Sequence, residues 1–327
     1  MSKFLLVLSF FLIVLVTLSY FCFPFILFTT PPQSQLEVNK EQNTLEATEN
    51  SIKILQLTDL HVNGKIGMPL VFSIMKAAIR KSEPDLIVIT GDVFSNGCGE
   101  KDVKILCDFM ERVGIPWAVT LGNHDDETPY SMEELSEILE NSKGSLFKRG
   151  DLSDRYGNYY YYLHFPDGKT QQLIFMDTRI AGFSEESVDF YENTVLDSAR
   201  FDGESTTKNL LFYHTPLPEL LDAVNTYKID SSIGSGKLGE PPCIQGTSVN
   251  FFDKVLELNR TQAMIYGHDH YNNAIINYQG VDFCYGTKTG TASGHNFKLG
   301  GNLITLSSNG EYTIDRLLHW GKGEEHE

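Results

Sequence analysis

The sequence predicts an α/β domain built on two β-sheets. Over residues 51–140, short apolar runs alternate with stretches of helical periodicity, which is typical of parallel strands joined by crossover helices. From residue 158 onwards, apolar runs follow one another around turn residues, which predicts hairpins and a second sheet. The chain has 327 residues, of which 41% are hydrophobic, so it is long enough to bury a large core.

The first part of the domain is expected to contain three strands and three helices. Each strand is a short apolar run that reads as buried. Pro69 suits the first turn of the first helix, and Ser131 with Glu134 forms a capping box that begins the third. The expected elements are strands at 52–58, 86–90 and 117–121 and helices at 69–81, 102–113 and 131–140.

The second part is expected to be richer in strands. Asp167-Gly168 is a hairpin turn between two apolar runs, and Gln279-Gly280 and Asn309-Gly310 mark two further turns. The glycine-rich stretch 229–246 predicts a long loop, and loops of this length inside a domain are often functional. The expected elements are strands at 158–165, 172–177, 210–213 and 262–266, helices at 218–225 and 249–258, and a β-rich region from residue 273.

Residues 1–28 are predicted to form an N-terminal signal-anchor transmembrane helix. The run from Leu5 to Phe28 has no charged residue, and about 20 apolar residues are enough to cross a bilayer. A signal peptide is the alternative, but aromatic side chains stand where a small-residue cleavage site is expected. Lys3 on the short side predicts a lumenal or extracellular domain, anchored in the membrane or secreted after cleavage.

Composition sets the other boundaries and excludes one class of partner. Residues 29–50 are polar and predict a flexible linker, residues 51–320 form the folded domain, and residues 321–327 form a polar tail. The formal net charge of −17 argues against nucleic acid as a partner, because phosphate backbones are bound by Lys and Arg.

Cysteines and one sequon bear on the compartment. Four cysteines outside the apolar segment allow two disulfides in an oxidising compartment, and buried or free thiols are the equal alternative. Asn259-Arg260-Thr261 is an N-glycosylation sequon, which fits a lumenal glycoprotein. The four cysteines are Cys98, Cys107, Cys243 and Cys284.

Five short motifs place metal-ligand residues at the ends of predicted strands. In open α/β sheets, ligands bind beyond the carboxyl ends of the strands, so these residues are expected to meet at one edge. Two-metal sites use carboxylate and amide oxygens, imidazoles, and one carboxylate that bridges both ions, a role that suits Asp92. The motifs are Asp59-Leu60-His61, Gly91-Asp92, Gly122-Asn123-His124-Asp125, His214 and Gly267-His268-Asp269-His270.

The order of these motifs resembles the calcineurin-like metallophosphoesterase superfamily over most of residues 51–285. Within it, the chain is similar to small purple-acid-phosphatase-like enzymes and to phosphatases of dosage-dependent cell-cycle regulation. The resemblance implies a four-layer αββα sandwich of two mixed β-sheets flanked by helices. Purple acid phosphatases carry an iron-binding Tyr where this chain has Ser95, and they lack the histidine that His61 provides, so no purple iron centre is expected.

The resemblance also implies a role for each motif residue. Two metal ions, of Fe, Mn or Zn, would be held in two sites. His124 would stabilise the transition state or protonate the leaving oxygen, and Asp125 would orient it. The implied ligands are Asp59, His61 and His270 for the first ion, Asp92 as the bridge, and Asn123, His214 and His268 for the second.

The expected activity is hydrolysis of phosphate monoesters by a metal-bridging hydroxide. The substrate would be a phosphorylated small molecule or a phosphoprotein. A phosphodiesterase or nucleotide pyrophosphatase on the same site is the alternative, and a catalytically inactive binding module is a third reading, whose mark would be missing ligands. Arg179, after the strand at 172–177, is either a phosphate contact or a surface ion pair.

Overall fold

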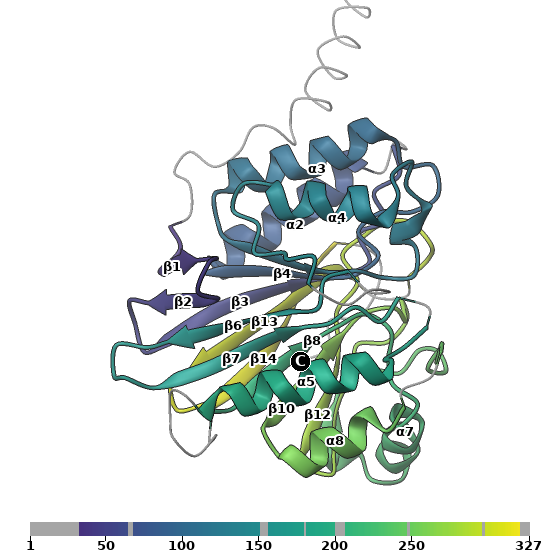
Figure 1. Cartoon of the computed structure of the whole chain (residues 1–327). Coiled ribbons are helices and arrows are strands. Elements are labelled where there is room, and N and C mark those ends of the chain that lie inside the picture. Colours follow the sequence, from purple (N-terminus) through teal and green to yellow (C-terminus); the bar gives the residue numbers. More distant parts are fainter. Residues whose placement is uncertain are drawn as a thin grey trace, which may run out of the picture.

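The computed structural model describes residues 33–64, 68–150, 156–179, 181–199, 207–246, 249–295 and 298–320. These residues form an α/β fold with a nine-stranded sheet, a five-stranded sheet and six α-helices. The two sheets are stacked in the middle of the molecule, with α2, α3 and α4 on one side and α5, α7 and α8 on the other (Figure 1). The predicted four-layer sandwich is therefore confirmed.

The five-stranded sheet carries the predicted alternation of strands and helices. Its order is β14-β13-β3-β4-β5, and β3, β4 and β5 are parallel, as expected. The Ser131 capping box begins α4 as predicted. The elements of this half are β3 (Ser51–Leu57), α2 (Met68–Ser82), β4 (Leu86–Thr90), α3 (Glu100–Val113), β5 (Trp117–Thr120), α4 (Met132–Asn141), β13 (Leu299–Ser307) and β14 (Tyr312–Trp320).

The nine-stranded sheet has the order β1-β2-β6-β7-β8-β10-β12-β11-β9. The predicted hairpin of β6 and β7 is antiparallel, whereas β7, β8, β10 and β12 run parallel. Its elements are β1 (Leu36–Asn39), β2 (Thr44–Ala47), β6 (Tyr159–His164), β7 (Thr170–Phe175), α5 (Glu185–Asp197), β8 (Asn209–Phe212), α7 (Leu220–Ile229), β9 (Gly234–Ser235), α8 (Phe251–Leu258), β10 (Thr261–Tyr266), β11 (Ile275–Tyr278) and β12 (Val281–Tyr285).

Side-chain alternation in the nine-stranded sheet separates two cores. On β8, Leu210 and Phe212 belong to the core shared with the five-stranded sheet, whereas Leu211 belongs to the core beneath α5, α7 and α8. Successive side chains of a strand point to opposite faces, and here both faces are covered. Burial on both faces explains why the strand reads as a continuous apolar run.

The prediction of a flexible linker at 29–50 is wrong for residues 36–47. Residues 36–39 and 44–47 form the antiparallel pair β1 and β2, and β2 adds in parallel to β6 at the edge of the nine-stranded sheet. Leu36 and Leu45 are buried while most of the segment is polar, so its average composition resembles a tether. The sheet supplies the backbone partners that local composition does not reveal.

Helix α5 was not expected from the sequence. Its buried side chains form a narrow stripe of Ser187, Tyr191, Thr194 and Val195, which contains only two large apolar residues. Ser184 caps the helix by accepting a hydrogen bond from the Ser187 N–H. Polar positions inside a buried stripe weaken the helical pattern on which the prediction depends.

The four cysteines of the described domain are free thiols, so the alternative without disulfides is the one found. No helix among the described residues is long and apolar enough to cross a membrane. The predicted anchor at residues 1–28 and the polar tail at 321–327 lie outside the described residues.

Candidate metal centre

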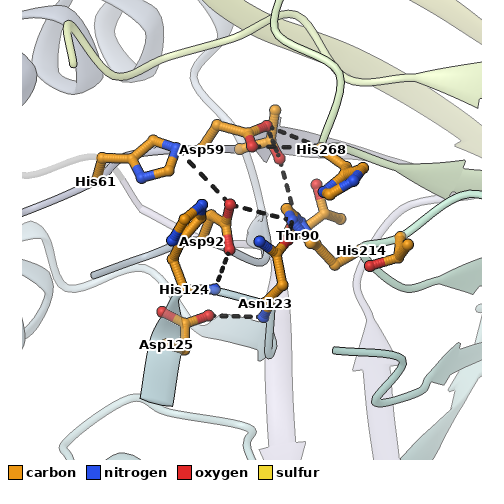
Figure 2. Close-up of polar contacts among 12 residues, drawn as sticks. Asp59, His61, Thr90, Asp92, Asn123, His124, Asp125, His214 and His268 are labelled. Carbon is orange, nitrogen blue, oxygen red and sulfur yellow. Dashed lines mark hydrogen bonds and ion pairs between the residues drawn. The ribbon is translucent and has the colours of Figure 1, made fainter. Parts of the chain in front are cut away.

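All five motifs meet where strands of both sheets end. Asp59, Asp92 and Asn123 follow β3, β4 and β5, while His214 and His268 follow β8 and β10. Their side chains point toward one another in a single cluster (Figure 2). The expectation that ligands gather beyond the carboxyl ends of the strands is met in both sheets.

The first ligand set consists of Asp59, His61, Asp92 and His270. All four offer a ligand atom, and these atoms lie within 4.8 Å of one another. The Nε2 atoms of His61 and His270 are 3.1 Å apart, and His270 Nε2 lies 3.3 Å from Asp59 Oδ1. His61 Nε2 is 3.7 Å from Asp92 Oδ2. Two imidazole nitrogens and two carboxylates thus face one small volume.

The second ligand set consists of Asp92, His214 and His268, again within 4.8 Å of one another. His214 Nε2 lies 3.3 Å from Asp92 Oδ2 and 3.2 Å from the amide oxygen of Asn123. Asp92 belongs to both sets, and the backbone N–H of His124 donates to its other oxygen, Oδ1, at 2.9 Å. This sharing is what a carboxylate that bridges two ions requires.

The backbone at the site is held in a conformation that non-glycine residues rarely adopt. Asp59, His61, Asp92 and His268 have φ values of 52°, 49°, 47° and 77°. Each such residue costs about 1–3 kcal/mol, and such residues persist where the surrounding structure enforces them, often at functional sites. Four predicted ligands have this strained backbone, so the orientation of their side chains is obtained at a cost in stability.

Hydrogen bonds behind the imidazoles fit them to a metal. A backbone carbonyl only accepts, so His214 Nδ1 donates to Thr90 O at 2.8 Å and His270 Nδ1 donates to Ser293 O at 3.2 Å. Both rings therefore turn Nε2 toward the carboxylates, as in metal sites where the second nitrogen is fixed by an outer partner. Among the described residues, His268 Nε2 is buried and has no hydrogen-bond partner, and a cation would satisfy it.

Burial and charge favour the protonation states that metal binding needs at His61, His268 and Asp92. Burial, with the charge of Lys288, lowers the pKa of His61 to about 3, and burial with the charge of His214 lowers the pKa of His268 to about 4. Burial alone would raise the pKa of Asp92, but His214 outweighs it and holds that pKa at about 2. Neutral imidazoles and ionised carboxylates are the forms that bind metals. Burial would also lower the pKa of His214, but the carboxylate of Asp92 outweighs it and raises that pKa to about 10, so an ion bound there must displace a proton.

Lys288 is a buried cation behind the first ligand set, and the sequence did not single it out. Its side chain is 2% exposed, and Nζ donates to the backbone oxygen of Asp59 at 3.3 Å. Burial lowers the pKa of Lys288 to about 8. Lys288 therefore connects the turn after β3 to the segment between β12 and β13 by a hydrogen bond.

His124 lies at the edge of the cluster, and its partner is Glu127. His124 Nδ1 donates to Glu127 Oε1 at 2.9 Å. Burial disfavours the imidazolium, but the hydrogen bond to Glu127 raises the pKa of His124 above its ordinary value. Asp125, which we expected to orient His124, instead accepts from the backbone N–H groups of Phe94 and Gly122 at 2.8 and 2.7 Å. The role assigned to Asp125 is therefore wrong: it positions two motif loops.

A family comparison agrees with this geometry. The family model described as calcineurin-like phosphoesterase matches residues 52–272. The chain belongs to this family. The match begins in β3 and ends just after the Gly267–His270 motif, so it contains every predicted ligand of this phosphoesterase.

Individual relatives of the phosphoesterase are distant. It is 27% identical to the "Probable inactive purple acid phosphatase 14" of Arabidopsis thaliana, over 73% of this chain and 70% of the relative. It is 26% identical to "Phosphatase DCR2" of Saccharomyces cerevisiae, over 75% of this chain and 49% of that protein. It thus spans about half the length of the yeast relative. A dimetal phosphatase from Danio rerio shares the fold, with a TM-score of 0.53, 11% identity and coverage of 78% of this chain and 92% of that chain.

The predicted loop at 229–246 supports the last motif of the phosphoesterase. The Gly239 N–H donates to Asn272 Oδ1 at 2.8 Å, and the Cys243 N–H donates to Asp269 Oδ1 at 3.1 Å. Asp269, between the two histidines of that motif, also accepts a hydrogen bond from Tyr285. The loop therefore borders the centre and fixes the turn that carries His268 and His270.

Arg179 has an ion-pair partner in this domain. Its Nε lies 2.9 Å from Asp177 Oδ2, and Asp177 is fully buried. Of the two readings of Arg179, the ion pair is therefore the one found, although its partner lies in the core rather than on the surface.

Replacing Asp125 by alanine should destabilise the phosphoesterase. The change leaves the buried N–H groups of Phe94 and Gly122 without their acceptor, and each unsatisfied group costs about 1–3 kcal/mol. We expect urea unfolding of metal-free protein to show a loss of about 2 kcal/mol or more. The exposed neighbour Asp126 is the matched control, and Asp126→Ala should stay within about 0.5 kcal/mol of wild type. Equal stability of the two variants would contradict the positioning role.

Proposed function

We propose that the protein hydrolyses phosphate monoesters. The observation that carries the proposal is the pair of ligand sets that share Asp92, one with His61 and His270, the other with His214 and His268. A phosphate monoester is a dianion near neutral pH, and a chain with a net charge of −17 needs bound cations to receive it. A shared carboxylate between two buried sets supports a centre of two ions.

Metal ions held there would supply positive charge to the phosphate oxygens and would acidify the attacking water. The chain's own groups do the rest. The His124 N–H fixes one oxygen of Asp92, and the side chain of His124 is 41% exposed at the edge of the centre. Water loses one proton to solvent, its oxygen bonds to phosphorus, and the bond from phosphorus to the leaving oxygen breaks. His124 Nε2 gives its proton to that oxygen, which leaves as an alcohol.

The relatives support hydrolysis of phosphate esters without fixing the ester type. The yeast relative is named a phosphatase, whereas a Psychrobacter arcticus protein, 24% identical over 74% of this chain, is named a probable cyclic nucleotide phosphodiesterase. Some plant relatives are named inactive. This chain keeps all seven ligand residues, which favours activity: Asp59, His61, Asp92, Asn123, His214, His268 and His270.

A comparison of two chromogenic esters tests the proposal. Purified full-length protein, loaded separately with Mn²⁺, Zn²⁺ or Fe²⁺, is assayed on p-nitrophenyl phosphate and on bis(p-nitrophenyl) phosphate. We expect the monoester to have the higher kcat/KM. On phenyl phosphate, whose leaving oxygen needs a proton, we expect His124→Ala to lower kcat by about 100-fold or more. A higher kcat/KM for the bis-ester would replace the monoesterase by a phosphodiesterase. Hydrolysis of neither ester with any metal would contradict the proposed function.

A further inference from the structure

Glu127 joins two motif loops through its two carboxylate oxygens. Oε1 lies 2.9 Å from His124 Nδ1, and Oε2 accepts the backbone N–H of Asn96 at 2.6 Å. Asn96 belongs to the loop that carries Asp92, and Glu127 follows the loop that carries Asn123. With one oxygen on each loop, the carboxylate cannot rotate without losing a charge-assisted hydrogen bond.

The local backbone explains why Glu127 reaches His124. Residues Asp125–Glu127 form a single 3-10 turn, and the Glu127 N–H donates to the His124 carbonyl at 3.1 Å. Side chains three residues apart in such a turn lie on the same side. Asp125, one residue after His124, points instead into the core, where it is fully buried. The carboxylate that pairs with the His124 imidazole is therefore Glu127, three residues later, and not Asp125, the next residue.

The contact fixes which nitrogen of His124 carries the proton. An ionised carboxylate only accepts hydrogen bonds, so Nδ1 must be the donor. In the neutral ring the remaining nitrogen, Nε2, is then unprotonated, and in the charged ring it carries the second proton. A ring that gives its Nε2 proton to a leaving oxygen ends as the Nδ1–H tautomer, which Glu127 stabilises.

We propose that Glu127 is the positioning residue of His124, holding its ring and its tautomer so that Nε2 serves the leaving oxygen. The inference rests on the proposed function for its catalytic meaning, but the tautomer is independent of turnover. No proton passes to Glu127; it stays a carboxylate that accepts from Nδ1 throughout.

The first test reads the tautomer directly in metal-free protein. The ¹⁵N shifts of the His124 ring are recorded by long-range ¹H–¹⁵N correlation in wild type, Glu127→Gln and the control Asp126→Asn. Asp126 is the exposed acidic neighbour, so its change removes the same charge from the same turn. We expect wild type and Asp126→Asn to show a protonated Nδ1. In Glu127→Gln, the signal of a protonated Nδ1 should be lost, because the amide NH₂ group of glutamine is a donor and disfavours a second donor at His124 Nδ1. An unchanged pattern in Glu127→Gln would overturn the proposal.

The second test distinguishes a role in positioning His124 from disruption of the surrounding loop. Glu127→Gln keeps an oxygen that accepts the Asn96 N–H, so the loop stays anchored. With phenyl phosphates, we expect kcat to fall about 10-fold, KM to change little, and the loss to grow as the leaving alcohol becomes a poorer leaving group. An equal loss on good and poor leaving groups would contradict the proposal. If wild type hydrolyses no ester but its tautomer still depends on Glu127, the proposed function fails and the positioning role stands.

Discussion

Replacing Asp92 by asparagine is expected to remove hydrolysis and to reduce the metal content of the protein to one ion or less. Asp92 Oδ2 lies 3.3 Å from His214 Nε2 and 3.7 Å from His61 Nε2, so its charge serves both ligand sets. Asparagine keeps one oxygen but loses the charge, and its amide nitrogen cannot bind a cation. A bound metal ion contributes several kcal/mol to the stabilisation of the transition state, so its loss should lower kcat about a thousandfold or more.

Asp85→Asn is the matched control for this change. Asp85 is also a buried aspartate, but its carboxylate accepts the backbone N–H groups of Gln35 and Lys53, before β4 begins. Metal content by mass spectrometry and phosphate release are measured for both variants. We expect Asp85→Asn to lose stability while retaining metal and kcat. Wild-type metal content in Asp92→Asn would remove Asp92 from the bridging position.

Replacing Gly91 by alanine is expected to disrupt the second ligand set although every ligand residue remains. A Cβ at Gly91 would lie 2.3 Å from His214 Nδ1, the atom that donates to Thr90 O, so the ring must move. Gly91 also has φ +79°, a conformation that favours glycine. We expect the affinity for the second ion to fall by about 100-fold, which competition with a chelating dye would measure.

Gly114→Ala separates the steric effect from the conformational one. Gly114 has φ +76°, but a Cβ there meets nothing within 4 Å. This control should lose about 1 kcal/mol of stability through its backbone alone and bind metal as wild type does. If Gly91→Ala also bound two ions with wild-type affinity, the close packing of Gly91 against His214 would not be what orients the ring.

The sequence predicted the strand ends and the ligand residues well because both follow from local patterns. A buried parallel strand is a continuous apolar run, so the ends of β3, β4, β5, β8 and β10 could be read, and the ligands follow directly. The side chains behind the ligands were harder to predict. The sequence does not single out Glu127, because Asp125 is the nearer carboxylate along the chain and only the 3-10 turn decides which of the two reaches His124.

Long-range pairing was also beyond the sequence. Strand β13 pairs antiparallel with β3, which lies about 250 residues earlier, and β2 pairs with β6 in the nine-stranded sheet. Lys288 reaches Asp59 because β12 and the segment after it return to the centre. Such contacts depend on which distant strands pair in each sheet. A pattern within a window of about 11–18 residues carries no information on that pairing.

The central claim is that two ions bind side by side and share Asp92. Electron paramagnetic resonance of full-length protein loaded with Mn²⁺ tests it most directly, with total manganese measured on the same sample. We predict two ions per chain with the spectrum of an exchange-coupled pair, and loss of the coupling in Asp92→Asn. Less than about one ion per chain, or an uncoupled spectrum of isolated Mn²⁺ at full loading, would contradict the claim.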